Sequence, residues 1–322
     1  MTQPPRAIPV RTIPPRTIPG RTIIVTACNS RFSGLLRGLL ATLQPLLEDP
    51  SVQLACFDIG LGAEDRAWLL RQGALVRTPE AHFGLDAADH PVPLLSFLAR
   101  PFLRKYFPGY DFYVWIDSDI WLQDAGVVAK YIDGATRCGL AVTHEEERAY
   151  RFQPWLFGWT AKHFLLGYGP LTGAYLLARP HVNAGFFALT ADAPQWAAWA
   201  RRYEAALQRT GKLVPHDQFA LNHALHVRGR DRVPVAMLDP GCNWICERGT
   251  PMWNDAEGGF CKPYPPYEMI GAIHLAGPAK EKRFRVRRTG GGVFTTYLVH
   301  GACPDQPADV WPGQALAVAA AA

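Results

Sequence analysis

The sequence predicts an α/β protein with a doubly wound mixed sheet flanked by helices. Short apolar runs rich in β-branched residues, of which Thr22–Ala27 is the first, are typical of buried strands. Segments with helical periodicity follow these runs, and such alternation is typical of a doubly wound sheet. The chain has 322 residues and 48% of them are hydrophobic, so it can bury a full core.

The expected elements alternate regularly up to Asp124. The expected strands are Thr22–Ala27, Val52–Ile59, Ala74–Arg77 and Phe112–Ile116, and the expected helices are Phe32–Leu47, Glu64–Gly73 and Leu94–Phe107. Residues 144–182 are rich in aromatic residues and glycine, and we expect them to be irregular. Later expected elements are the strands Phe186–Leu189, Val233–Met237 and Ile270–Leu275 and the helices Pro194–Gln208 and Asp217–His226. A proline-rich repeat in residues 1–20 predicts a disordered arm, and residues 301–322 are expected to form a tail.

The composition of the chain limits the kinds of binding partner and the cellular compartment that we expect for the protein. The net charge of +5 suits an anionic ligand or a membrane surface, but it is too weak and too dispersed to favour nucleic acid. No apolar run has the length of a membrane span, so we expect no transmembrane segment, while peripheral membrane contact stays open. Seven cysteines in a chain of this length indicate reduced thiols and a cytoplasmic protein. Cys242, Cys246 and Cys261 are interpreted as free thiols because their spacing lacks a paired zinc motif.

Asp117 and Asp119 are the most informative residues of the chain. They follow the apolar run Tyr113–Ile116, and the apolar pair Ile120-Trp121 comes directly after them. Two unpaired carboxylates at a buried position cost several kcal/mol unless a cation or protons neutralise them. The pair therefore predicts a Mn²⁺ or Mg²⁺ site at the end of a strand, with diphosphate oxygens as further ligands.

A second motif lies near the end of the expected fold. The imidazole of His274 is an acceptable ligand for Mn²⁺, Gly277 would let the backbone approach a phosphate, and Lys280 could neutralise it. By itself, however, a single histidine after a strand is more often structural.

Two further motifs have ordinary structural interpretations. Asn183-Ala184-Gly185 could direct amide groups at a sugar, or it could simply be a turn before the Phe186 strand. Asp217 and Gln218 could face the sugar and the reacting bond, although Asp217 is also a suitable helix N-cap.

Taken together, these motifs resemble those of the family 8 glycosyltransferases and their relatives of the GT-A fold, which include bacterial lipooligosaccharide galactosyltransferases and glycogenin. The resemblance extends from about Ile23 to Lys280, and its motifs keep the family's order. The matching segments are Val25–Phe32, Ala99–Phe102 with Arg100 seventeen residues before Asp117, the Asp-x-Asp pair, Asn183–Gly185, Asp217–Asn222, and His274, Gly277 and Lys280. The chain departs from the family at Asn29, where aspartate is usual, and at Glu281-Lys282, which replace Pro-Trp.

The resemblance implies a single GT-A catalytic domain over residues 21–300, with a donor half at about 21–125 and an acceptor half at about 126–300. It implies metal-dependent transfer of a hexose from a nucleotide-diphospho-sugar donor, with retention of configuration. The donor that the resemblance favours is a UDP-sugar. The implied metal is Mn²⁺ (or Mg²⁺), held by Asp117, Asp119 and His274. The implied catalytic residues are Gln218, Asp217 and Lys280, and the implied donor contacts are Ala27, Asn29, Arg31, Arg100, Asp117, Ser118, Asn183, Ala184, Gly185, Gly277 and Lys280.

Three alternatives remain open. An inverting enzyme of the same fold would need a carboxylate base, for which Glu145, Glu146 and Asp217 are candidates. A sugar-1-phosphate nucleotidyltransferase is disfavoured because Cys28–Arg31 contains no glycine, and a non-catalytic nucleotide-sugar-binding scaffold is disfavoured by the intact motifs.

The acceptor class also stays open among carbohydrate, lipid-linked glycan, protein and small molecule. We expect the aromatic segment Tyr150–Tyr175 to contact it. The basic cluster Arg283–Arg288 could hold an anionic acceptor or lipid headgroups, or it could be a solvated strand.

Overall fold

The computed structural model describes residues 18–86, 88, 90–211, 216–226 and 233–309. Most of the expected N-terminal arm, and the end of the expected tail, therefore lie outside the described residues. Ile18 is described, and its side chain is buried in the same core cluster as the first two strands.

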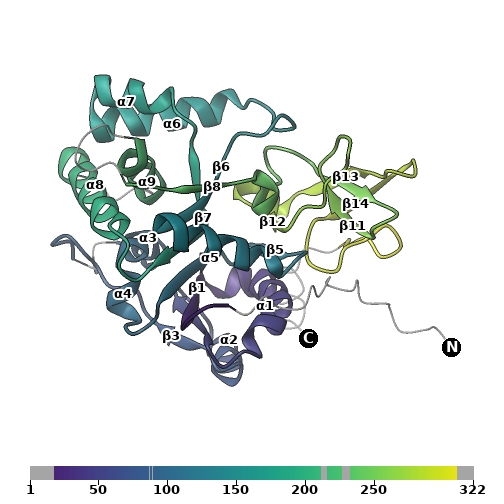
Figure 1. The fold of residues 1–322 in the computed structure, drawn as a ribbon, viewed down its shortest axis with the longest axis horizontal. Helices are drawn as coiled ribbons and strands as arrows, with labels where there is room; N and C mark the ends of the chain where they lie inside the picture. The colour runs from purple at the N-terminus through teal and green to yellow at the C-terminus, as the bar shows by residue number, and fades with distance from the viewer. Residues whose placement is uncertain (1–17, 87, 89, 212–215, 227–232, 310–322) are drawn as a thin grey trace.

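The centre of the fold is a seven-stranded mixed sheet in the order β3-β2-β1-β4-β7-β6-β8 (Figure 1). Strands β1, β2, β3 and β4 run parallel, β7 runs antiparallel to β4 and β6, and β8 runs parallel to β6. This sheet confirms the predicted fold class. Its strands are β1 (Thr22–Cys28), β2 (Val52–Asp58), β3 (Leu75–Arg77), β4 (Phe112–Ile116), β6 (Leu140–His144), β7 (Val182–Thr190) and β8 (Ala236–Leu238).

Helices cover both faces of this sheet because its central strands are apolar on both sides. Ile24 and Val114 face one core with α1 (Ser33–Leu47), α2 (Ala63–Arg71) and α5 (Gly126–Cys138). Val25 and Trp115, one residue further along each strand, face the opposite core with α3 (Val92–Ala99), α8 (Gln195–Thr210) and α9 (His216–His226).

A second region of short strands lies beside the main sheet (Figure 1). The strands β5 (Ile120–Leu122), β12 (Ala272–His274) and β9 (Trp244–Ile245) form a three-stranded sheet in that order. Two hairpins accompany it, β10 (Met252–Asn254) with β11 (Gly259–Cys261), and β13 (Arg283–Arg287) with β14 (Val293–Tyr297). Because β5 follows β4 almost at once, this arrangement brings the end of the main sheet against residues from the last quarter of the chain.

The structure corrects several expected elements. Residues 144–182 are not irregular, because they contain α6 (Pro154–Tyr168) and α7 (Pro170–Leu177). Their apolar residues lie on both the buried and the exposed sides, which hides the helical period from the sequence. The expected helix Leu94–Phe107 is divided at Pro101 into α3, a 3₁₀ turn η3 (Arg100–Phe102) and α4 (Leu103–Tyr106).

Strand β12 covers only Ala272–His274 of the expected range Ile270–Leu275, and strands β7 and β8 differ most from their expected ranges. Strand β7 begins at Val182, so Asn183-Ala184-Gly185 lies inside a strand and is not a turn before it. Strand β8 covers Ala236–Leu238 instead of beginning at Val233. The remaining short 3₁₀ turns are η1 (Ser30–Phe32), η4 (Pro240–Cys242) and η5 (Gly277–Glu281). None of the helices in the described part of the chain has the length and apolar character needed to cross a bilayer.

Candidate active site

The site lies where β4 ends and the chain turns into β5. The backbone N–H of Asp117 donates to the carbonyl of Gly185 at 2.8 Å, which ties the turn to β7. Strand β12 pairs antiparallel with β5, with His274 opposite Ile120, and the N–H of Leu275 donates to the carbonyl of Asp119 at 3.0 Å. Backbone pairing therefore brings His274 beside Asp119, although 155 positions separate them in the sequence.

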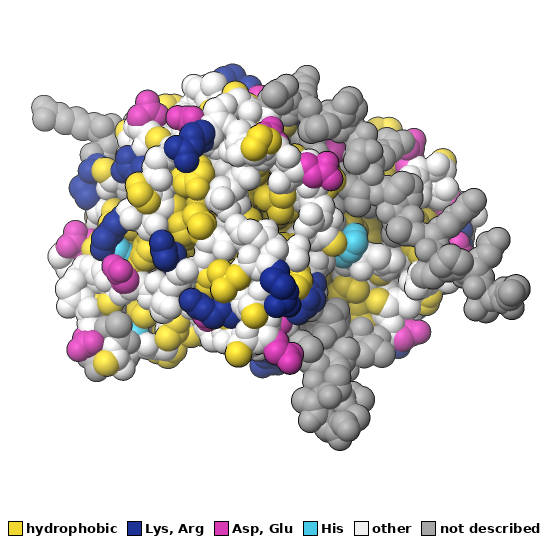
Figure 2. Space-filling view, turned by 90° about the horizontal axis from the view of Figure 1, so that it is seen from below, with side chains coloured by type: hydrophobic (Ala, Val, Ile, Leu, Met, Phe, Trp, Pro, Cys, Tyr) yellow, Lys and Arg dark blue, Asp and Glu magenta, His cyan; other side chains and the backbone are white. Residues whose placement is uncertain are grey.

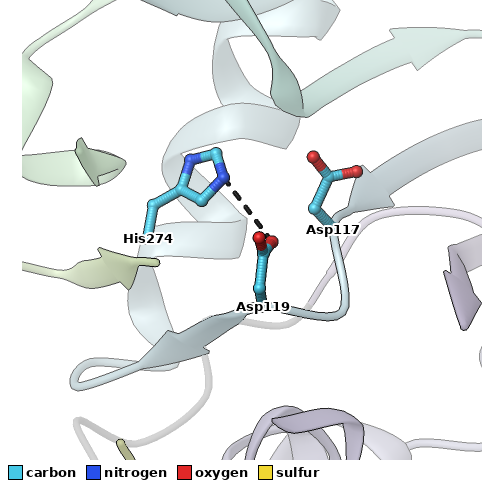
Figure 3. A group of neighbouring side chains, drawn as sticks. All are labelled: Asp117, Asp119 and His274. Carbon is cyan, nitrogen blue, oxygen red and sulfur yellow. Dashed lines mark ion pairs between the residues drawn. The ribbon is translucent and has the colours of Figure 1, made fainter. Parts of the chain in front are cut away.

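Asp117, Asp119 and His274 form a group of three potential metal ligands (Figure 3). One ligand atom from each lies within 4.8 Å of the others, and His274 Nε2 is 3.6 Å from Asp119 Oδ1. Asp119 Oδ1 and His274 Nδ1 are both buried with no hydrogen-bond partner among the described residues. Buried polar atoms of this kind are costly unless a ligand satisfies them, so the residues fit a divalent cation.

The charges around the three ligands favour this use. Burial lowers the pKa of His274 against the opposing effect of Asp119 and Asp117, so the imidazole is neutral and has a free lone pair. Burial would raise the pKa of Asp119, but Lys280 and His274 hold it below its usual value, so the carboxylate is ionised. The Lys280 ammonium, carried on η5, forms an ion pair with Asp119 Oδ2.

Gly185 leaves room for the three ligands. A Cβ atom at this position would lie 2.6 Å from His274 Cε1, and 2.8 Å from both Asn183 Oδ1 and Asp117 Oδ2. Real Cβ atoms do not approach other atoms so closely, and none of these neighbours is a freely moving chain end. Glycine is therefore required here for the close approach of β7 to the ligand group, and not for an unusual backbone angle.

Arg100 connects the ligand group with α9. Its Nη2 donates to Asp117 Oδ1 at 2.7 Å, and its Nη1 donates to Asp217 Oδ2 at 2.5 Å. The guanidinium lies over the ring of Trp115, 4.6 Å from its centroid, and the side chain of Arg100 is only 7% exposed. Burial lowers the pKa of Arg100, but the two carboxylates outweigh it and raise the pKa, so the guanidinium stays charged. Burial raises the pKa of Asp217, and the guanidinium opposes that shift.

Gln218 belongs to a second hydrogen-bond network. Its Oε1 accepts from the backbone N–H of Ala184 at 3.1 Å, and its Nε2 donates to Glu145 Oε1 at 3.0 Å. Glu145 Oε1 also accepts from Asn183 Nδ2 at 2.9 Å, and Glu145 Oε2 accepts from Arg248 Nη2 at 2.7 Å. One donor and one acceptor therefore fix the orientation of the Gln218 amide, and three donors occupy both oxygens of Glu145.

Arg248 was missed by the sequence analysis, which also considered Glu145 only as a base. Glu145 follows the end of β6 and Arg248 lies just beyond β9, so no local motif connects them. Glu145 is the first of three consecutive glutamates, so nothing in the local sequence distinguished it from its neighbours.

The remaining predicted donor contacts gather at the ends of β1 and β4, which are adjacent strands. Ala27 is half-buried near the end of β1, and Asn29 precedes η1 with its Oδ1 buried and without a partner among the described residues. The Cys28 thiol contacts Ser118, and burial raises the pKa of this thiol to about 12. Arg31 is more exposed, and its Nη2 lies 2.5 Å from Glu281 Oε1, beside Lys280.

A cavity of about 150 Å³ adjoins this site. Asn183, Gln218 and Gly277 line it on the side of the predicted donor contacts, and Trp155 and Trp159 of α6 line it on the other. The expected aromatic segment thus does reach the site. A second cavity of about 260 Å³ reaches Asp119 from the side of α1, and Arg37 and His300 contribute to its lining.

No family model matches the chain, and no curated protein matches it. Similar solved structures include the galactosyltransferase LgtC in complex with donor and acceptor sugar analogues, with 14% identity, a TM-score of 0.47, and 80% of this chain and 88% of that chain covered. The apo bifunctional glycosyltransferase WbbM has 14% identity and a TM-score of 0.47, with 81% of this chain and 46% of that chain covered. Mouse xyloside xylosyltransferase 1 has 11% identity and a TM-score of 0.44, with 79% of this chain and 96% of that chain covered.

These similar structures are glycosyltransferases, the class that the sequence motifs resemble. At such identities and with TM-scores below 0.5, the likeness carries no argument about the reaction of this chain. The site itself is a group of oxygen and nitrogen ligands suited to a divalent cation at the edge of a mixed sheet.

Proposed function

We propose that the protein is a metal-dependent glycosyltransferase that moves a hexose from a UDP-sugar to an acceptor, with retention of configuration. The observation that carries this proposal is the group Asp117, Asp119 and His274, whose ligand atoms lie within 4.8 Å of one another and include two buried atoms without partners among the described residues. Two further cations, Arg100 and Lys280, lie in contact with its carboxylates. Such a concentration of cationic groups suits a diphosphate leaving group.

A bound Mn²⁺ or Mg²⁺ on these three residues would supply a Lewis acid that neutralises diphosphate charge. Two residues of the chain, Lys280 and Gly277, would contact the same diphosphate. Lys280 lies at the edge of the site with its side chain 22% exposed, so its ammonium can turn from Asp119 to a phosphate oxygen of the donor. Gly277 has a φ of +56°, which places the start of η5 in a conformation that glycine favours and allows the backbone to approach that phosphate.

Gln218 and Asp217 would position the donor sugar. The amide of Gln218 is held by Ala184 and Glu145, and Asp217 is held by Arg100, so neither group needs to reorganise during the reaction. In the reaction the bond between the sugar C1 and the phosphate oxygen breaks, a bond forms from the acceptor oxygen to C1, and the departing phosphate oxygen takes the acceptor proton.

Retention is favoured by the state of the candidate bases. Glu145 already accepts hydrogen bonds from Asn183, Gln218 and Arg248, so its lone pairs are engaged. Asp217 is buried in an ion pair with Arg100. An inverting enzyme needs a carboxylate that is free to take a proton from the acceptor, and neither residue has that freedom. Glu146, the third candidate base, is exposed and does not line the cavity beside Gln218. The alternative of a sugar-1-phosphate nucleotidyltransferase is disfavoured by the turn after β1, which enters η1 without a glycine-rich loop.

The test is release of UDP from a panel of UDP-sugars, measured with Mn²⁺ and with chelator. We expect slow hydrolysis of one sugar nucleotide by the native protein, loss of that activity in chelator, and loss in Asp119→Asn, which keeps the shape of the side chain and removes its charge. Asp117→Ala should also be inactive.

Asp111→Asn is the matched control, because Asp111 lies just before the opposite end of β4 and its carboxylate accepts from the backbone N–H of Arg21, away from the ligand group. This variant should keep full activity. UDP release that persists in chelator, or that is equal in Asp119→Asn and Asp111→Asn, would exclude the metal-dependent reaction. Tight UDP binding without turnover of any sugar nucleotide would favour the scaffold alternative.

A further inference from the structure

The helices α6 and α7 carry a concentration of exposed apolar side chains. They lie along the upper edge of the molecule, away from β1 and α2 (Figure 1). We call this surface the α6–α7 face. It consists of the exposed side chains of Phe152, which lies just before α6, and of Trp155, Phe157, Trp159, Leu165, Leu166 and Leu171. The other large apolar side chains that are exposed among the described residues are dispersed over the fold, namely Leu70, Leu75, Val92, Met237 and Val293.

The opposite side of the same two helices is packed against the protein. Phe164 and Leu176 form a small buried cluster with Phe219 of α9. Arg209 Nε of α8 donates to the carbonyl of Leu166 at 3.1 Å, which fixes the end of α6. Helix α6 is therefore apolar on its buried side and also on its exposed side. A helix of that kind needs a second apolar environment beyond the protein's own core.

The charged residues in and around α6 and α7 indicate which apolar environment the exposed side of α6 would meet. No Asp or Glu occurs between Glu147 and Asp192, an interval of 44 residues (192 − 147 − 1) that contains Arg148, Arg151, Lys162 and Arg179. The chain as a whole has 28 acidic residues, so the interval departs strongly from its average. The surface seen from below, on the other side of the molecule from α6 and α7, intersperses basic, acidic and apolar side chains (Figure 2).

A segment that combines exposed apolar side chains with basic residues and has no carboxylate of its own is complementary to an anionic bilayer. Lys and Arg are attracted to acidic headgroups, and exposed Trp side chains favour the boundary between headgroups and acyl chains. A second copy of this chain is a poorer occupant, because two such faces would bring like charges together.

We propose that the α6–α7 face docks the protein on an anionic membrane surface, with its leucine, phenylalanine and tryptophan side chains inserted at the headgroup boundary. Trp155 and Trp159 belong both to this face and to the lining of the cavity beside Gln218. The cavity thus lies next to the bilayer surface. A corollary, which rests on the proposed transfer reaction, is that the acceptor is an amphiphile whose sugar or headgroup enters this cavity while its tail stays in the membrane.

The test is cosedimentation of the full-length protein with vesicles, without any sugar nucleotide. We expect binding to vesicles that mix zwitterionic and anionic phospholipids, weaker binding to purely zwitterionic vesicles, and weakening of the anionic case by salt. The double variant Leu166→Ser/Leu171→Ser removes two of the exposed leucines without touching the lining of either cavity described above. It should lower the partition coefficient by at least about tenfold.

Leu70→Ser/Val293→Ser is the matched control, because these side chains are 54% and 49% exposed and lie on α2 and β14. It should bind vesicles as the native protein does. Both double variants should keep the native rate of donor hydrolysis without vesicles, so a failure of the docking proposal is distinguishable from a failure of the proposed reaction. Equal binding by the two double variants, or no binding to anionic vesicles, would overturn the proposal. So would a native dimer in sedimentation velocity that only Leu166→Ser/Leu171→Ser dissociates.

Discussion

At the level of single residues, the site depends on the absence of a side chain at Gly185 as much as on its three ligand residues. Asp117, Asp119 and His274 supply ligand atoms, but they can gather only because Gly185 has no side chain between them. Asp119 and His274 each keep one buried polar atom without a partner among the described residues. A folded protein retains such costly atoms where a ligand satisfies them.

Gly185→Ala tests this argument. The added methyl group would force His274 or Asp117 to move, so metal-dependent donor hydrolysis should fall by about 100-fold or more. The free energy of unfolding should fall by only about 1–3 kcal/mol. Gly158→Ala is the matched control, because its Cβ would meet nothing within 4 Å on exposed α6. Activity and metal affinity that are unchanged in Gly185→Ala would show that the ligand group does not need this space.

At the scale of elements, the interruption of the helical segment at Pro101 determines where Arg100 points. The chain leaves α3 and enters η3 at Arg100, and the guanidinium reaches both the end of β4 and the start of α9. The periodicity predicts one continuous helix through residues 94–107, and such a helix would contain no 3₁₀ turn at Arg100. Arg100 therefore joins three elements through one buried charge, and Asp217 depends on it for compensation.

Arg100→Met should destabilise the protein by about 3–5 kcal/mol, because it leaves Asp217 buried without its partner. Arg104→Met is the control: Arg104 is exposed, donates to the carbonyl of Ala191 and lies 5.5 Å from the centroid of the Trp196 ring, so a change within about 1 kcal/mol is expected. Chemical denaturation of the native protein and the two variants measures these changes in the free energy of unfolding. A loss for Arg100→Met that is no larger than that for Arg104→Met would contradict the role of the buried ion pair.

At the scale of the whole molecule, the ligand group connects two sheets. Asp117 and Asp119 follow the end of the main sheet, whereas His274 belongs to β12 of the three-stranded sheet. The unfolded chain cannot hold these residues together, because 155 positions separate Asp119 from His274. Binding of metal and nucleotide is therefore coupled to the folded arrangement of the two regions.

Mn²⁺ with UDP should raise the melting temperature of the native protein, by an amount that corresponds to about 2.7 kcal/mol at a ligand concentration 100 times the dissociation constant. Asp119→Asn should lose the part of the shift that depends on Mn²⁺, because the charged ligand is gone. Differential scanning calorimetry with Mn²⁺, with UDP, and with both separates the contributions. An equal shift in both proteins would mean that Mn²⁺ acts elsewhere.

The alternating strands and helices of the first half were predictable from local sequence, because a local run such as Thr22–Ala27 or a local period such as that of Phe32–Leu47 depends only on neighbouring residues. The sequence also identified Asp117 and Asp119, since two carboxylates between apolar residues are unusual in any fold. The contacts of Glu145 with Arg248, the need for glycine at 185 and the exposed side of α6 were decided only by tertiary structure. Each of these features depends on the distance between segments that are remote in the sequence, or on which side of a helix is exposed to solvent. Local periodicity predicts neither.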